Sequence, residues 1–205
     1  MVSVIPALTE TPSDGKPERI SDRPGPSDRE LVRRCLQGDR HGYQQLYRRH
    51  QAQVRSTLYQ LCGPSHLDDL VQEVFLRVWK GLPKFRQASQ FSTWLYRIVW
   101  NVASTERRQL AQAYEQQQTL CQAVGTSPDN SDFNLMHLHY QDLVRRGLAK
   151  LSLDHRAVLV LHDLEDVPQK EIAKILSVPV GTVKSRLFHA RAAMRKFLQA
   201  EGVQL

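Results

Sequence analysis

The sequence has little cysteine and no long hydrophobic run. Its 3 cysteines lie far apart among 205 residues and form neither a CxxC pair nor a mixed Cys/His pattern, which argues against a zinc site or a redox pair. No apolar run approaches the roughly 18 residues of a membrane span, and the first residues lack the apolar core and cleavage site of a signal peptide. We therefore expect reduced thiols, no bound metal or cofactor, no membrane insertion and a cytoplasmic location.

Strand-like alternation and internal repeats are also missing. Apolar residues recur instead at three- and four-residue steps, as they do on one face of a helix. The clearest example is Leu67, Leu70, Val71, Val74, Phe75, Val78 and Trp79. The expected fold class is all-α, with two small helical domains joined by a flexible linker and a helix-turn-helix in the C-terminal domain.

Composition divides the chain into four parts. Residues 1–26 are rich in Pro, Ser, Asp and Gly and are expected to be a disordered extension. Residues 27–109 carry the pattern of four helices. Residues 110–134 have neither a helical period nor enough apolar residues for a core, so they are expected to form the linker. Residues 135–205 form the second domain, which is expected to end in two short helices.

Capping residues predict where several helices begin. Ser27 and Glu30 form an S-x-x-E capping box ahead of an apolar run. Ser65, Ser92 and Ser152 stand before later helical patterns. Each of these serines is expected to accept a hydrogen bond from a backbone N–H of the first helical turn.

Charge is unevenly distributed along the chain. The formal net charge is +7, and residues 180–200 contain several Lys and Arg but neither Asp nor Glu. A basic surface attracts phosphate and releases condensed counterions on binding. Nucleic acid is therefore a better explanation of this region than a solvated surface.

Residues 169–187 have the pattern of a helix-turn-helix, in which Ile172 and Leu176 bury the first helix and Val183 and Leu187 bury the second. The residues left pointing outward or flanking are Thr182, Lys184, Ser185, Arg186, Phe188, His189 and Arg191. They suit a DNA major groove, where Lys and Arg donate to guanine or phosphate and an exposed Phe packs on a thymine methyl. The alternative is an ordinary helical bundle with a basic solvent face.

Several motifs resemble those of bacterial RNA polymerase sigma factors of the sigma-70 family. Residues 180–191 (VGTVKSRLFHAR) resemble the promoter-reading helix, and residues 151–159 (LSLDHRAVL) resemble the helix pair before it. Residues 68–80 (DDLVQEVFLRVWK) and 91–101 (FSTWLYRIVWN) look like the signature helices of the family's N-terminal domain. The resemblance covers about 27–198, and the short connection between domains is similar to the compact extracytoplasmic-function (ECF) group.

The resemblance implies a protein that binds core RNA polymerase, recognises the minus-thirty-five and minus-ten elements of promoter DNA, and promotes DNA opening. Such a protein is not an enzyme, because the catalytic chemistry belongs to the polymerase, and an anti-sigma partner is expected. The outward residues of the helix-turn-helix would read the minus-thirty-five element. A polymerase-binding face, which on its own would be read as solvated helix surface, would consist of Asp68, Asp69, Leu70, Gln72, Glu73, Arg77 and Trp79.

The minus-ten element places a physical demand on the first domain. Unpaired bases need new stacking partners, and stacking on an aromatic ring is worth about 1–3 kcal/mol per base. The resemblance assigns a flipped base to the loop 86–90, and the expected contacts are Arg86, Ser89, Phe91, Tyr96, Arg97, Trp100, Asn101 and Arg108. Tyr96 and Trp100 are expected to be exposed, whereas Trp94 is equally consistent with core packing.

Two other classes of function stay open. The helix-turn-helix also resembles that of response-type regulators, so an autonomous helix-turn-helix transcriptional regulator is the alternative, although no receiver-like alternation of strands and helices precedes it. The second class is an enzyme, which would need a catalytic or metal site. His137 and His139, or Asp68 and Asp69, have no metal-ligand or acid/base partners at a telling spacing.

Overall fold

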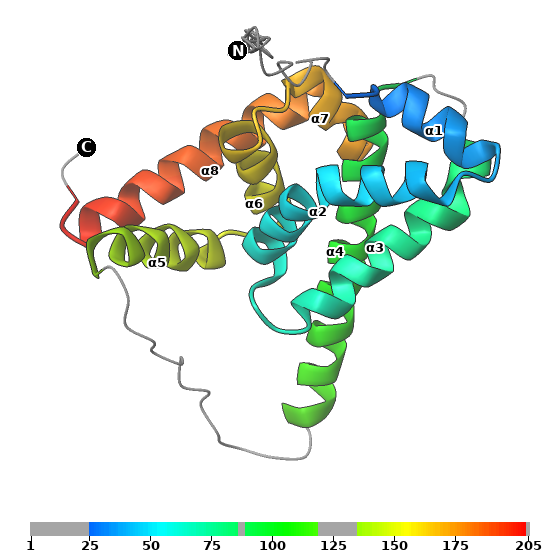
Figure 1. Ribbon diagram of the computed structural model, residues 1–205. Coiled ribbons are helices and arrows are strands. Elements are labelled where there is room, and N and C mark those ends of the chain that lie inside the picture. The colour runs from blue at the N-terminus through cyan, green and yellow to red at the C-terminus, as the bar shows by residue number, and fades with distance from the viewer. Residues whose placement is uncertain (1–24, 86–88, 119–134, 204–205) are drawn as a thin grey trace, which may run out of the picture.

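The computed structural model describes residues 25–85, 89–118 and 135–203. Within these ranges every regular element is a helix (Figure 1), which confirms the all-α fold class. The elements are α1 (Asp28–Leu36), α2 (Arg40–Cys62), α3 (Leu67–Gly81), α4 (Phe91–Gln118), α5 (Leu135–Lys150), α6 (Leu153–Leu159), α7 (Gln169–Leu176) and α8 (Val180–Ala200), with a 3₁₀ turn η1 (Leu82–Lys84) and a π-helical turn η2 (Val160–Leu164). The predicted extension over 1–24 and the predicted linker over 119–134 lie outside the described residues.

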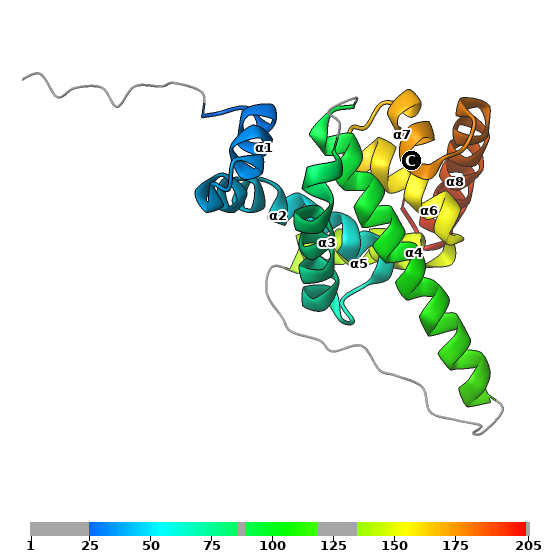
Figure 2. The ribbon, with the colours of Figure 1, turned by 90° about the vertical axis from the view of Figure 1, so that its right-hand side faces the viewer.

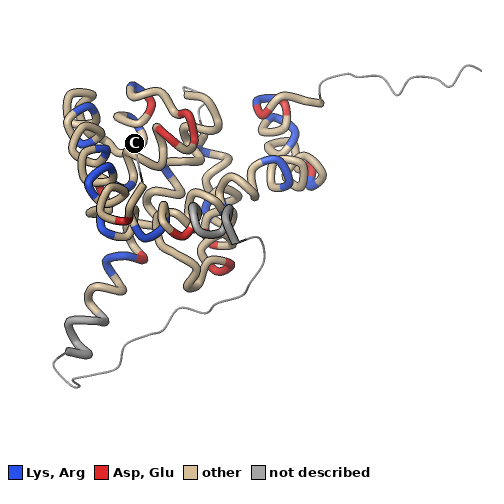
Figure 3. Tube along the Cα trace, turned by 90° about the vertical axis from the view of Figure 1, so that its left-hand side faces the viewer, with Lys and Arg blue, Asp and Glu red and all other residues tan. Residues whose placement is uncertain are grey.

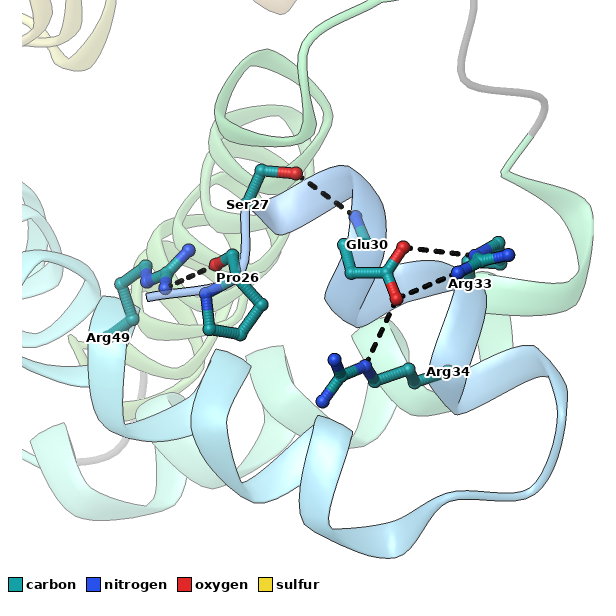
Figure 4. A network of polar contacts seen from close by, with 6 residues as sticks. All are labelled: Pro26, Ser27, Glu30, Arg33, Arg34 and Arg49. Carbon is teal, nitrogen blue, oxygen red and sulfur yellow. Dashed lines mark hydrogen bonds and ion pairs between the residues drawn. The ribbon is translucent and has the colours of Figure 1, made fainter. Parts of the chain in front are cut away.

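The Ser27 hydroxyl caps α1 as expected. It accepts a hydrogen bond from the Glu30 backbone N–H at 3.3 Å. The Glu30 carboxylate is directed not to the capping box but to Arg33, whose Nε and Nη2 donate at 3.0 and 2.9 Å, and to Arg34 Nε at 3.2 Å (Figure 4). Guanidinium groups one turn along the helix are the stronger partners for a carboxylate, because both charges contribute to the hydrogen bonds.

The start of α1 is fastened to α2. Arg49 donates to the Pro26 carbonyl at 2.7 Å (Figure 4) and to the Asp28 carboxylate at 2.6 Å. His50 Nε2 lies 3.0 Å from the other Asp28 oxygen. The hydrogen bond with His50, together with that from Arg49, holds the pKa of Asp28 below its ordinary value.

Two of the three later cap predictions are wrong. The residue before α3 is His66, not Ser65, and its left-handed backbone (φ 56°) carries no side-chain cap. The acidic first turn of α3 takes the place of a cap, because carboxylates are stabilised at the positive end of a helix. Helix α4 begins before Ser92. The prediction for Ser152 is confirmed, since its hydroxyl accepts from the His155 N–H at 3.4 Å.

Helices α1 to α4 enclose an aliphatic core. Its most deeply buried side chains include Leu31, Leu46, Leu58, Leu61, Val74, Val78 and Val99. Trp94 closes one side of this core: a Cβ on Gly81 would come within 2.9 Å of the indole, and the rings of Phe85 and Phe91 lie 4.8 and 5.7 Å from it between centroids. Trp94 is therefore mainly a packing residue.

Helix α4 runs past the predicted end of the first domain. It is 28 residues long and continues to Gln118, so the prediction of a linker is wrong for residues 110–118. This segment is made mostly of Ala, Gln and Glu, which are good helix formers. A helix that extends beyond its domain needs no core of its own, and composition that argues against a core does not argue against a helix.

Helices α7 and α8 form the predicted helix-turn-helix. Ser177, in the left-handed conformation (φ 55°), makes the turn between them. Ile172, Val183 and Leu187 are buried as expected. The close approach of these two helices fixes the face that α8 turns to solvent.

Helix α8 is 21 residues long, so the prediction of two short final helices is wrong for it. Its second half has a partner of its own, because α5 packs against it. A Cβ on Gly147 of α5 would lie within 2.9 Å of the Phe197 ring and would overlap the Met194 sulfur. Only a glycine allows this approach.

Candidate nucleic-acid interface

The outward face of α8 carries the residues expected to read DNA. Val183, Leu187 and Ala190 are buried on the opposite face. The exposed residues between them are Lys184, Ser185, Phe188 and His189. Phe188 is 71% exposed; one exposed apolar residue is ordinary, but here it lies on a helix along which Lys and Arg recur and acids are absent (Figure 3). That combination fits a DNA groove.

The two arginines of this helix that were expected to touch DNA have carboxylate partners within the protein. Arg186 donates to Asp154 of α6 at 2.6 Å. Arg191 donates to both oxygens of Asp163 in η2, at 3.0 and 2.5 Å, and these bonds hold the pKa of Asp163 below its ordinary value. Sequence reasoning missed both acids, because they lie 32 and 28 positions upstream. The pairs tie α8 to α6 and η2 and orient its exposed face.

The residues expected at the minus-ten element are divided between open and covered positions. The exposed ones are Arg97, Asn101 and Arg108, and the half-buried ones are Ser89 and Trp100. Phe91 and Tyr96 are each only 6% exposed, so the expectation of an exposed Tyr96 is wrong. Arg86 lies outside the described residues.

Phe91 is covered within its own domain. Its ring lies 5.2 Å from the His50 imidazole and 6.0 Å from the Phe85 ring, between centroids. This packing holds the first turn of α4 against α2 and η1. In this arrangement Phe91 positions the start of α4, and its ring is not available for a base to stack on.

Tyr96 is covered by the second domain. Its hydroxyl donates to the Glu165 carboxylate at 2.9 Å, and the Thr57 hydroxyl donates to the other oxygen of Glu165 at 2.9 Å. Burial, together with the negative charge of Glu165, holds the pKa of the Tyr96 phenol above its ordinary value, so the phenol is a stable donor. Sequence reasoning missed Glu165 because it lies 69 positions from Tyr96.

Two more hydrogen bonds join the domains beside Tyr96. The Thr93 hydroxyl donates to the Glu171 carboxylate at 3.1 Å, and Arg97 donates to the Ser177 hydroxyl at 2.7 Å. Helix α7 thus packs across the first turns of α4 (Figure 2). The two domains, expected to be joined by a flexible linker, also share a polar interface.

The acidic face of α3 is open to solvent. The side chains of Asp68 and Asp69 are 84% and 82% exposed, and Trp79 is 46% exposed. Gln72 is also exposed, and Glu73 and Arg77 form a half-exposed ion pair at 2.7 Å. Leu70 differs from the prediction: it is 6% exposed and belongs to the core, because it follows the apolar stripe of α3.

A groove of about 660 Å³ lies between α2 and α3 next to this face. Its wall contains four aromatic side chains, Tyr43, Tyr47, Phe75 and Trp79. The Tyr43 hydroxyl donates to the Phe75 carbonyl at 2.6 Å, and burial raises the pKa of Tyr43 to about 12. Sequence reasoning placed only Trp79 of these four on a binding face, because the groove forms between two helices.

Among the described residues, no group of three or more His, Cys, Asp or Glu side chains could hold a metal ion. The side chains of His137 and His139 lie outside the description. Cys35 and Cys62 are free thiols, and Cys121 is outside the described ranges. None of the described helices combines the length and the apolar content that crossing a membrane requires.

Residues 46–112 match the protein family described as Sigma-70 region 2, and residues 141–194 match Sigma-70, region 4. The chain is 31% identical over 183 residues to the ECF RNA polymerase sigma-E factor of Escherichia coli (strain K12), covering 84% of this chain and 95% of that protein. The protein of that name from Haemophilus influenzae is 30% identical over 181 residues, covering 84% and 96%. The chain belongs to the ECF group of the sigma-70 family of RNA polymerase sigma factors.

Two solved structures share the fold of this protein. The structure of CnrH in complex with the cytosolic domain of CnrY has a TM-score of 0.65 and 26% identity, covering 84% of this sigma factor and 97% of that chain. The sigma factor RpoE of Bartonella quintana, in complex with the anti-sigma factor NepR, has a TM-score of 0.62 and 22% identity, covering 77% and 96%. In this sigma factor, region 2 runs from α2 to α4 and region 4 from α5 to α8.

Proposed function

We propose that this sigma factor binds core RNA polymerase through α3, reads the minus-thirty-five element through α8, and captures unpaired bases of the minus-ten element through α4 and the loop before it. It acts in the cytoplasm beside the polymerase and is not itself an enzyme. The observation that carries this proposal is the face of α8, which presents Lys184, Ser185 and Phe188 to solvent on a helix without acids. We assign the first domain to residues 27–118, which takes in the whole of α4, and the second to residues 135–205.

The chemistry of α8 suits direct reading of bases. Lys184 can donate to guanine, and Phe188 can pack on a thymine methyl. The Ser185 hydroxyl can pair with either a hydrogen-bond donor or an acceptor on a base edge. His189 and Thr182 flank this ridge. Arg186 and Arg191, held by carboxylates in the free protein, act first by orienting α8, and each keeps donors for phosphate contacts because a guanidinium has five.

The chemistry of α4 suits a single strand. Trp100 and Asn101 offer a ring and an amide, while Arg97 and Arg108 supply positive charge for phosphates. Arg86, Ser89 and Tyr96 complete the minus-ten set by their likeness to the family pattern, whereas Phe91 is buried and only holds the start of α4 in place. Tyr96 becomes available to DNA only when the second domain leaves it.

The polymerase face is formed by exposed acids beside the aromatic groove. Asp68, Asp69 and Trp79 are its most accessible members, and Gln72, Glu73 and Arg77 complete it. Leu70 supports it from the core. We also propose an anti-sigma partner, because solved relatives of the same fold are complexes with CnrY and with the anti-sigma factor NepR.

Transcription in vitro tests the proposal. Core polymerase is supplied with genomic DNA, with and without the protein, and start sites are mapped. Start sites that appear only with the protein, and that weaken with Lys184→Ala, are expected. Specific binding of the protein alone to duplex DNA, with no effect on polymerase, would instead favour the autonomous regulator.

A further inference from the structure

The contact between the domains has its centre at Glu165. This residue follows η2, and its two carboxylate oxygens lie 2.9 Å from the hydroxyls of Tyr96 of α4 and Thr57 of α2. Thr57 shares its one proton between Glu165 and the Gln53 carbonyl, which is also 2.9 Å away. Thr57 is fully buried and Tyr96 nearly so. A carboxylate in this position therefore joins both helices of the first domain with charge-assisted hydrogen bonds, which are stronger than neutral ones.

The donors on α4 lie on one face. Tyr96 and Arg97 come three and four positions after Thr93, which makes each of them its neighbour on the helix surface. Their acceptors all come from the second domain: Glu171 for Thr93, Glu165 for Tyr96 and Ser177 for Arg97. Two of these acceptors are carboxylates, which resemble phosphate oxygens as hydrogen-bond acceptors. The second domain thus presents to α4 negatively charged oxygen acceptors, as the phosphates of a nucleic acid backbone would.

The interface also contains an unfavourable element. Arg156 of α6 is 4% exposed and donates to carbonyl oxygens, Leu61 at the end of α2 at 2.8 Å and Leu151 at 3.3 Å. Its Nε is buried without a hydrogen-bond partner, and burial lowers the pKa of this guanidinium. A buried charge held only by carbonyl groups is costly. Arg156 therefore contributes an unfavourable term to the contact between the domains.

We propose that in the free protein the second domain closes over α4 with Glu165 as the latch, and that single-stranded minus-ten DNA competes with the second domain for Tyr96 and Arg97. The proposal rests on the proposed function in one respect, the assignment of Tyr96 and Arg97 to the promoter strand. It explains why Tyr96 is covered while its neighbours Trp100 and Asn101 remain accessible. Separation of the domains by the polymerase would uncover the complete minus-ten face.

The test uses the full-length protein and Glu165→Gln, which removes the negative charge and one acceptor oxygen while keeping the size of the side chain. The matched control is Asp166→Asn, which removes the same charge from the next residue. Asp166 is exposed, and its left-handed backbone (φ 51°) tolerates asparagine. Small-angle X-ray scattering measures the size of the molecule. Fluorescence anisotropy measures the affinity for a labelled single-stranded oligonucleotide with a minus-ten sequence.

Glu165→Gln is expected to increase the radius of gyration and to raise the affinity for the single strand roughly tenfold, as for the loss of one strong hydrogen bond. Asp166→Asn is expected to change neither quantity. Thr57→Val, which removes a donor on the other side of the latch, should open the molecule in the same direction. The proposal is overturned if Glu165→Gln keeps the size and affinity of the unaltered protein, or if Asp166→Asn changes both equally.

The same proteins separate this proposal from the proposed function. Each is added to core polymerase on a promoter template. If Glu165→Gln opens the molecule and binds the single strand more tightly, but no form of the protein directs transcription, the latch stands and the proposed function fails. If transcription depends on the protein while Glu165→Gln has no effect on size or affinity, the proposed function stands and the latch fails.

Discussion

Asp163 accepts two hydrogen bonds from Arg191, from Nε at 3.0 Å and from Nη2 at 2.5 Å, and so joins the turn η2 to the recognition helix α8. The Arg191 hydrogen bonds hold the pKa of Asp163 below its ordinary value. An aspartate of this kind stabilises the folded state above its unfolded pKa, and that contribution is lost as the pH falls through the folded pKa. Because the pair is largely exposed, its contribution is small.

We expect Asp163→Asn to lower the free energy of unfolding at neutral pH by at most about 1 kcal/mol. The difference in unfolding free energy between the two proteins should shrink as the pH falls below about 4, the ordinary pKa of aspartate. Asp163 of the unaltered protein then becomes protonated and, like asparagine, carries no charge to pair with Arg191. Urea unfolding at a series of pH values measures this, with Asp166→Asn as a neighbouring acid that lacks the ion pair. A difference that persists unchanged in strong acid would contradict the role given to the pair.

Gly147 is expected to tolerate no larger residue. A Cβ there meets Met194 and Phe197, and overpacking of this kind costs about 1–3 kcal/mol. Gly147→Ala should therefore lower the midpoint of chemical unfolding. Gly181→Ala is the control, because nothing lies within 4 Å of a Cβ at Gly181 in α8, and it should leave stability unchanged or raise it. Equal effects of the two changes would show that α5 and α8 are not in close contact.

Replacement of Phe188 and of Phe91 should have opposite effects: the first should weaken DNA binding but not stability, and the second should lower stability. Phe188 is 71% exposed and Phe91 is 6% exposed. Phe188→Ala is expected to change the free energy of unfolding by no more than about 0.5 kcal/mol while weakening promoter binding by the polymerase complex. Phe91→Ala is expected to destabilise by about 3–5 kcal/mol. Thermal unfolding and a binding assay on the same preparations decide this, and destabilisation by Phe188→Ala would place that ring inside the protein.

Tyr43 offers a spectroscopic test of the α2–α3 groove. Its pKa is raised to about 12 by burial, and its hydroxyl donates to the Phe75 carbonyl. Absorbance titration should show one phenol ionising near pH 12 that is missing from Tyr43→Phe. The variant should also lose about 1 kcal/mol of stability with its hydrogen bond. Identical titration curves would mean that Tyr43 is more open to solvent than the structure has it.

Local patterns in the sequence were sufficient for much of the fold. The apolar stripe from Leu67 to Val78 and the exposed ridge of Lys184, Ser185 and Phe188 follow from helical periodicity, which depends only on neighbouring residues. Caps were less predictable: Ser27 and Ser152 hold their helices, whereas α3 begins without Ser65. A helix start depends on backbone geometry that tertiary packing can override.

What the sequence could not show are contacts between distant residues. No local sequence pattern sets Glu165, Asp154 and Asp163 apart from other acids, and only the packing of the second domain brings them to Tyr96, Arg186 and Arg191. The burial of Tyr96 has the same origin, since nothing within α4 distinguishes it from Trp100. The polar interface between the domains was therefore beyond any reasoning from periodicity.

The most direct test of the central claim compares two variants on one promoter, in complex with core polymerase. Lys184→Ala is expected to weaken binding to closed duplex DNA with little effect on the rate of opening once bound. Trp100→Ala is expected to bind closed DNA normally and to slow opening, followed by the fluorescence of a base analogue in the minus-ten element. Equal loss of both binding and opening in the two variants would contradict the division of work between α8 and α4.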